Sequence, residues 1–149
     1  MRQKIIAGLG VAATAVALWG APATQAQTVA APSAVAADDS FMVWTTDLCG
    51  SADFIDYGEG APGGGSNDDY VEVWDTCGDG HGVRAYAWLD GTYLGSKYNG
   101  NGNLQYVVWD PFGNVTARQS VGLKICLVDG ANDTTPSNCD EMTRTSEDG

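Results

Sequence analysis

Apolar and polar residues alternate along most of the chain from Phe41 onward, which is the pattern of strands that bury one face. Gly, Asn and Asp interrupt the alternation at short intervals, and no segment has the apolar spacing of a long amphipathic helix. The predicted strands are Phe41–Leu48, Asp53–Tyr57, Tyr70–Thr76, Val83–Leu89, Thr92–Lys97, Leu104–Trp109, Val121–Val128 and Cys139–Thr145. Seven or eight short antiparallel strands favour an all-β, immunoglobulin-like sandwich of two sheets, with a small barrel as the alternative.

The clearest turn is Asp90-Gly91, because this dipeptide supplies the two positive-φ positions of a tight hairpin turn. Counting outward from the turn predicts the cross-strand pairs Leu89–Thr92, Trp88–Tyr93, Ala87–Leu94, Tyr86–Gly95 and Arg84–Lys97. One face of this hairpin then carries small and aliphatic side chains suited to a core: Val83, Ala85, Ala87, Leu89 and Leu94.

The opposite face of the hairpin is the predicted binding site, made of Tyr86, Trp88 and Tyr93 with the cations Arg84 and Lys97. Two cations indicate that water reaches this face, and exposed aromatic rings can stack on sugars or hold an apolar partner. Two other interpretations remain. The aromatic residues could face the interior, or Tyr86 could cover Gly95 and serve only the sheet.

Four cysteines lie beyond the N-terminal apolar run, and an even number in a small exported domain predicts two disulfides. A metal site is disfavoured, because no Cys pair has close spacing and the chain has one His. In the strand Val121–Val128, Cys126 falls on the face opposite the apolar residues, which disfavours a bond through the core. We therefore expect Cys126 to pair with Cys139, leaving Cys49 with Cys77.

The N-terminus predicts a signal peptide over residues 1–26, with Arg2 and Lys4 before an apolar run that is short for a membrane span. A flexible leader over residues 27–40 and one domain over residues 41–149 would follow. The product is expected to be secreted and extracellular, to be monomeric, and not to insert into a membrane. Removing Arg2 and Lys4 changes the net charge from -12 to -14, which argues against nucleic acid or anionic lipid as a partner.

Candidate chemistry beyond binding is sparse. The acidic runs at residues 67–69 and 129–133, and the acids Asp75 and Asp79, could supply oxygen ligands to calcium, but none has the spacing of a known calcium loop. No metal or other cofactor is predicted. His81 stands among Gly and Asp residues, and no nucleophile motif accompanies it, so no catalytic residues are assigned.

Three features carry a resemblance: the Ala-rich start, the stretch Trp88-Leu89-Asp90-Gly91-Thr92, and Val121-Gly122-Leu123-Lys124-Ile125-Cys126 with its closing Cys139. In these the chain resembles small exported actinomycete proteins of uncharacterised function. In size, charge and disulfide number it is also similar to the apoprotein carriers of enediyne antibiotics, which are seven-stranded sandwiches. The first resemblance implies no catalytic residues.

Together these observations predict a secreted, non-catalytic module that binds a saccharide or a component of the cell envelope. The alternatives are a carrier of a small apolar ligand, which needs a cavity between the sheets, and a secreted hydrolase or protease inhibitor.

Overall fold

The computed structural model describes residues 38–58, 60–62 and 67–147. The predicted signal peptide and residues 27–37 of the predicted leader lie outside this part of the chain. Within the described residues eight strands form, one at each place where the alternating pattern predicts a strand. They are β1 (Phe41–Trp44), β2 (Gly50–Asp56), β3 (Asp69–Asp75), β4 (Gly82–Leu89), β5 (Thr92–Asn99), β6 (Gln105–Trp109), β7 (Ser120–Val128) and β8 (Ser137–Thr145).

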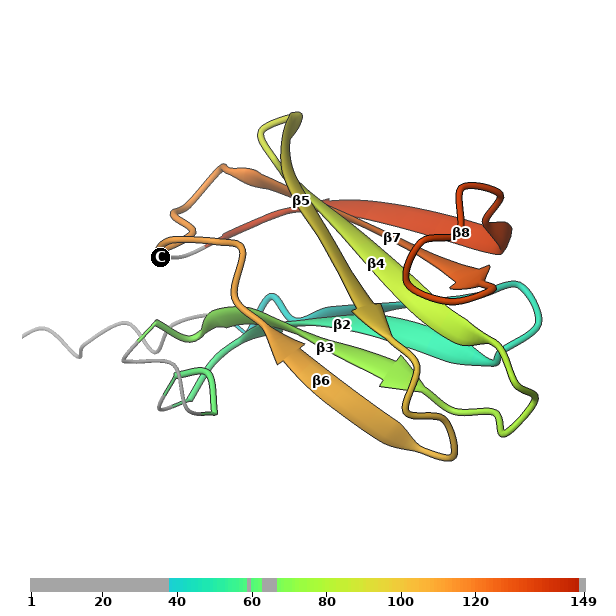
Figure 1. Ribbon diagram of the computed structural model, residues 1–149. Coiled ribbons are helices and arrows are strands. Elements are labelled where there is room, and N and C mark those ends of the chain that lie inside the picture. The colour runs from blue at the N-terminus through green and yellow to red at the C-terminus, as the bar shows by residue number, and fades with distance from the viewer. Residues whose placement is uncertain (1–37, 59, 63–66, 148–149) are drawn as a thin grey trace, which may run out of the picture. The chain divides into compact units, whose positions relative to one another are not determined.

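The strands form two antiparallel sheets of four, in the orders β1-β2-β3-β6 and β5-β4-β7-β8, and the described residues contain no helix. Figure 1 shows the sheets as two layers, with β2, β3 and β6 in one and β4, β5, β7 and β8 in the other. The predicted all-β sandwich is therefore confirmed. An immunoglobulin-like strand order is not confirmed, because β2 and β3 are neighbours in one sheet, whereas strands B and C of an immunoglobulin domain lie in different sheets.

Alternate residues of each sheet meet in a common core. The core side chains include Val43, Ala52, Val71, Val73, Val83, Ala85, Ala87, Val121, Leu123 and Ile125. The Phe54 ring packs between two other rings, with its centroid 5.6 Å from Phe41 and 5.4 Å from Phe112. Phe112 belongs to the loop after β6, so this loop closes one part of the core.

Both predicted disulfides are confirmed, Cys49–Cys77 and Cys126–Cys139. Cys126 and Cys139 join neighbouring strands, β7 and β8, at a place where the register shifts between Ile125 and Leu127. The bond therefore lies within one sheet and does not cross the core. The outward direction of Cys126, read from the alternation of β7, is what made this pairing predictable.

Candidate functional site

The β4–β5 hairpin positions the predicted binding residues. Asp90 and Gly91 have φ values of 49° and 76°, which confirms the positive-φ turn. The pairs Leu89–Thr92 and Trp88–Tyr93 are also as predicted.

Beyond Trp88 the predicted register is wrong, because β5 contains a bulge that adds one residue opposite Ala87. Gly95, with φ of 126°, pairs with Ala87, and Leu94 is the extra residue. Gly95 makes the bulge possible, since side-chain-bearing residues rarely adopt this φ. Each later residue of β5 consequently lies on the face opposite to the predicted one.

The corrected pairs are Tyr86–Ser96, Ala85–Lys97 and Arg84–Tyr98. The predicted pairs Tyr86–Gly95 and Arg84–Lys97 do not form.

The bulge leaves the three predicted aromatic residues together. Tyr86, Trp88 and Tyr93, called the aromatic strip below, lie in a row on the outer face of the second sheet. The Tyr86 and Trp88 rings have centroids 6.4 Å apart with an interplanar angle of 26°, and Trp88 and Tyr93 are 5.4 Å apart. Tyr93 is 53% exposed, whereas the alternating Ala85 and Ala87 are fully buried in the core. An inward orientation of the aromatic residues is thereby excluded.

The two predicted cations, Arg84 and Lys97, do not lie beside the aromatic strip as side chains available to a ligand. The Arg84 guanidinium donates hydrogen bonds to the backbone carbonyls of Ala131 and of Asp133, the latter at 3.1 Å. Arg84 therefore holds the loop between β7 and β8. Lys97 pairs with Ala85, on the core side of the sheet, as a direct consequence of the bulge.

A groove of about 270 Å³ opens beside Trp88, over β7 and β8. Gly122 pairs with Trp88 on one side and with Thr143 on the other, so a residue without a side chain forms the floor. A Cβ added at Gly122 would lie 3.3 Å from Thr143 Oγ1 and 3.5 Å from Trp88 Cβ. The polar border of the groove consists of Ser120, Glu141 and Thr143.

Sequence reasoning missed the groove, although one signal was present. Gly122 lies between Val121 and Leu123, which face the core, and successive strand residues point to opposite faces. The position of Gly122 on the outer face could therefore be predicted from the sequence. The contribution of β8 was not readable, because the order of strands in the sheet was unknown. Lys124 supplies the cation near the strip, since it pairs with Tyr86 and, on its other side, with Glu141.

The outer face of the first sheet carries a second group of residues that the sequence analysis did not select. The acidic-aromatic face consists of Met42, Trp44, Asp53, Glu72, Trp74 and Tyr106, which the register places on the side opposite the core. Trp74 and Tyr106 stack with ring centroids 4.5 Å apart. The signal was again alternation, because Glu72 and Trp74 alternate with the core residues Val71 and Val73.

Asp53 has the most unusual environment on this face. It is 9% exposed, and its Oδ1 has no hydrogen-bond partner among the described residues. Burial raises the pKa of Asp53 to about 6; a hydrogen bond with Ser51 opposes this shift, and the charge of Glu72 adds a smaller increase. Glu72 itself accepts a hydrogen bond from Trp74 Nε1 at 3.1 Å.

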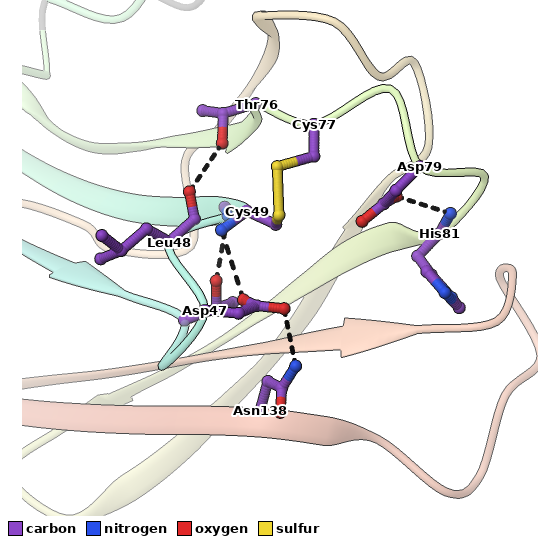
Figure 2. Close-up of a disulfide and its surroundings, with 10 residues drawn as sticks. Asp47, Leu48, Cys49, Thr76, Cys77, Asp79, His81 and Asn138 are labelled. Carbon is purple, nitrogen blue, oxygen red and sulfur yellow. Dashed lines mark hydrogen bonds between the residues drawn. A yellow bond between two sulfur atoms is a disulfide. The ribbon is translucent and has the colours of Figure 1, made fainter.

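A polar cluster surrounds the Cys49–Cys77 disulfide at one end of the sandwich. Figure 2 shows Asp47 accepting hydrogen bonds from the backbone N–H of Cys49 and from the Asn138 side chain, at 3.3 and 2.6 Å. Asp79 and the two sulfurs lie close enough for three metal ligands, but both sulfurs are bonded to each other and offer no thiolate. His81 Nδ1 lies 2.5 Å from Asp129 Oδ1, and this hydrogen bond, followed by the Asp129 charge, raises the pKa of His81.

The acidic loops are tied to their own backbone. Asp133 accepts hydrogen bonds from the backbone N–H groups of Asp129 and Thr135, at 2.9 and 2.7 Å. The Asn67 side chain donates to Asp110 and to the carbonyl of Phe112. The bond from Thr135 to Asp133 is that of an Asx turn, and the others join more distant positions, so these polar groups already have partners within the protein.

Comparisons with protein-family models, with curated proteins and with solved structures give no match for this chain. In the described part of the chain, no helix has the length and apolar character needed to cross a membrane.

Proposed function

We propose that this chain is a secreted, non-catalytic binding module that holds a neutral saccharide on the outer face of the β5-β4-β7-β8 sheet. The observation that carries the proposal is the aromatic strip lying directly beside a polar-edged groove, with Trp88 common to both.

The two parts of this surface match the two kinds of surface on a sugar ring. The C–H faces of a sugar can stack on accessible aromatic rings, which the half-buried Trp88 offers in the groove and the exposed Tyr93 offers next to Trp88. Sugar hydroxyls need hydrogen-bond partners, which Glu141, Thr143 and Ser120 supply along the edge. Because all these residues stand on strands, little ordering is needed when a ligand binds.

The net charge of the protein favours a neutral saccharide over an anionic one as the ligand. The chain carries a net charge of -12, so an anionic polysaccharide would be repelled over the whole surface. Near the strip, Lys124 is flanked in the sheet by Glu141, which balances its charge. A neutral chain of sugars is therefore the ligand that this surface fits best.

Export is part of the proposal. The N-terminal pattern of Arg2 and Lys4 before an apolar run is that of a signal peptide, and two disulfides persist in oxidising compartments outside the cytosol. Mass spectrometry of the protein recovered from culture medium tests this part, because cleavage near residue 26 predicts a loss of the N-terminal segment.

The binding test is isothermal titration of the mature protein with soluble hexamers of β-1,4-linked glucose, xylose and N-acetylglucosamine. We expect one hexamer to bind, and Trp88→Ala to weaken its association at least tenfold, which corresponds to about 1.4 kcal/mol. Gly122→Ala should weaken binding too, because its methyl group enters the groove floor.

Trp44→Ala is the matched control, since Trp44 is an exposed Trp on the other sheet. The proposal is wrong if none of the hexamers binds, or if Trp88→Ala and Trp44→Ala have equal effects. Circular dichroism of each variant separates lost binding from lost folding.

The carrier alternative has less support. A carrier of a small apolar ligand needs space between the sheets, and the hollow beside Phe41, Phe54 and Val121 has no room for a water molecule. Among the residues that the structure describes, the Asp53–Glu72 pair is the one observation in favour of a hydrolase or an inhibitor, and this pair lies on the outer face of a sheet.

A further inference from the structure

We infer that the acidic-aromatic face of the β1-β2-β3-β6 sheet is a docking surface for a protein partner that presents an arginine flanked by apolar side chains. This site lies on the sheet opposite the proposed saccharide site and is independent of it.

The first argument is an uncompensated acidic pair. Asp53 and Glu72 are direct cross-strand neighbours on β2 and β3. The described part of the chain holds five Lys and Arg residues, and none of them belongs to this sheet: Arg84, Lys97, Arg118, Lys124 and Arg144. The pair therefore has no cation of its own sheet to balance it.

The second argument is the unsatisfied oxygen of Asp53. A buried carboxylate oxygen without a hydrogen-bond partner is costly, and such groups call for a functional explanation. Met42 is the neighbour of Asp53 on β1, and it is 44% exposed. Because a Met side chain is flexible, Met42 can move aside and admit a donor from a partner.

The aromatic residues around the pair favour arginine over other cations. Trp74 and Tyr106 are stacked on each other beside Glu72, and Trp44 and Tyr106 are exposed. A guanidinium group can bond to carboxylates through several N–H groups while it stacks on an aromatic face. Trp, Tyr and Arg are also the residues that dominate binding energy at protein interfaces.

Other occupants fit less well. A second copy of this chain, docked through the same face, would bring two Asp53–Glu72 pairs together and add repulsion between like charges. Anionic membranes and nucleic acids would meet the same repulsion. A calcium ion needs six to eight oxygen ligands, more than one pair of carboxylates supplies.

The test uses two peptides of twelve residues with alternating leucine and arginine or leucine and citrulline. Citrulline keeps the shape of arginine and removes its charge. Binding is followed by NMR through the indole N–H signals of Trp44 and Trp74, with the Trp88 signal as an internal reference. We expect the arginine peptide to shift the Trp44 and Trp74 signals, and the citrulline peptide to bind at least tenfold more weakly.

The variant that tests the acidic pair is Asp53→Asn with Glu72→Gln, which should weaken the arginine peptide at least tenfold. Its control is Asp38→Asn with Asp140→Asn, which makes the same change in net charge at two exposed positions. Equal loss in both variants would show general attraction to an acidic protein and would overturn the inference. Equal binding of the two peptides, or shifts confined to Trp88, would overturn it as well.

Discussion

Asp53 lies directly opposite Glu72 in the antiparallel β2–β3 pair, and Asp53 is the more buried of the two acids. Like charges at directly opposed positions destabilise a sheet. Burial adds to this effect, because it disfavours the charged form of the Asp53 carboxyl. The folded state thus holds Asp53 in a place where ionisation is unfavourable.

This relationship predicts that Asp53→Asn stabilises the protein at neutral pH. The pKa of Asp53 is about 6 in the folded state against 3.8 as the ordinary value, so the folded protein binds the proton more tightly than the unfolded chain. The contribution of Asp53 to stability is therefore greatest below pH 3.8 and declines as the pH rises from 3.8 through 6. At pH 7 the variant should be more stable by about 1–3 kcal/mol, the range allowing for solvent screening.

Urea unfolding of both proteins between pH 3.5 and pH 7.5 measures this difference. The groups on neighbouring strands that titrate on this face are Glu72, Tyr70 and Tyr106, whereas β1 has none. Glu72→Gln should lower the pKa of Asp53 without abolishing the trend. A stability gap that stays constant over the whole pH range would contradict the assignment to Asp53.

A second prediction concerns Asn99, which is buried at the end of β5. Its Nδ2 donates to the backbone carbonyls of Val73 and Gln105, both at 2.9 Å, and its Oδ1 accepts from the backbone N–H of Asn101. Asn99 thereby ties the second sheet to β3 of the first. Asn99→Ala would leave these buried groups without partners and should cost about 2–4 kcal/mol of unfolding free energy.

Asn101→Ala is the matched control for this position, because Asn101 contributes only its backbone N–H to the network. Its unfolding midpoint in urea should stay close to that of the unmodified protein. Equal destabilisation by the two variants would refute the role given to the Asn99 side chain.

The two disulfides supply the third prediction. They separate their cysteines by 28 residues in Cys49–Cys77 and by 13 residues in Cys126–Cys139. Chain entropy predicts that removing the first costs about 3.5 kcal/mol and removing the second about 3 kcal/mol. Urea unfolding of the Cys49→Ala/Cys77→Ala and Cys126→Ala/Cys139→Ala proteins measures both values. A loss under about 1 kcal/mol for either pair would show that the unfolded chain gains little freedom there.

Much of this fold could be predicted from the sequence because half-buried strands produce an alternation of apolar and polar residues. The eight strands, the turn at Asp90-Gly91 and the pairing of Cys126 with Cys139 all follow from local pattern. The aromatic strip was predictable for the same reason, since Tyr86 and Trp88 alternate with the core residues of β4.

The remaining features depend on relations that local pattern does not contain. The bulge at Gly95 changes the direction of every later side chain of β5, and a Gly within a strand has several other uses. The groove forms only because β8 lies beside β7 in the sheet. The hydrogen bond from Arg84 to the Ala131 carbonyl likewise joins residues that are 47 positions apart in the sequence. The acidic-aromatic face was overlooked because hydrophobic periodicity draws attention to Val71 and Val73, not to the residues between them.

The last prediction concerns His81, the one His in the chain. Its ring is hydrogen-bonded to Asp129 Oδ1 and its backbone N–H to Asp79 Oδ1, at 2.5 and 2.9 Å. The hydrogen bond with Asp129 raises the pKa of His81 above the ordinary 6.5, because the protonated ring gains most from this partner. The resulting stabilisation is fully present below pH 6.5 and is lost as the pH rises through the pKa of the folded state.

A single imidazole signal makes the NMR titration of His81 unambiguous. Asp129→Asn should lower its pKa toward the ordinary value, since the variant removes both the charged hydrogen-bond partner and the nearby charge. Asp79→Asn should lower it less, because Asp79 acts on the ring only through its charge. If the two variants shift the titration equally, the His81 ring responds to the general acidity of this end of the sandwich and not to its contact with Asp129.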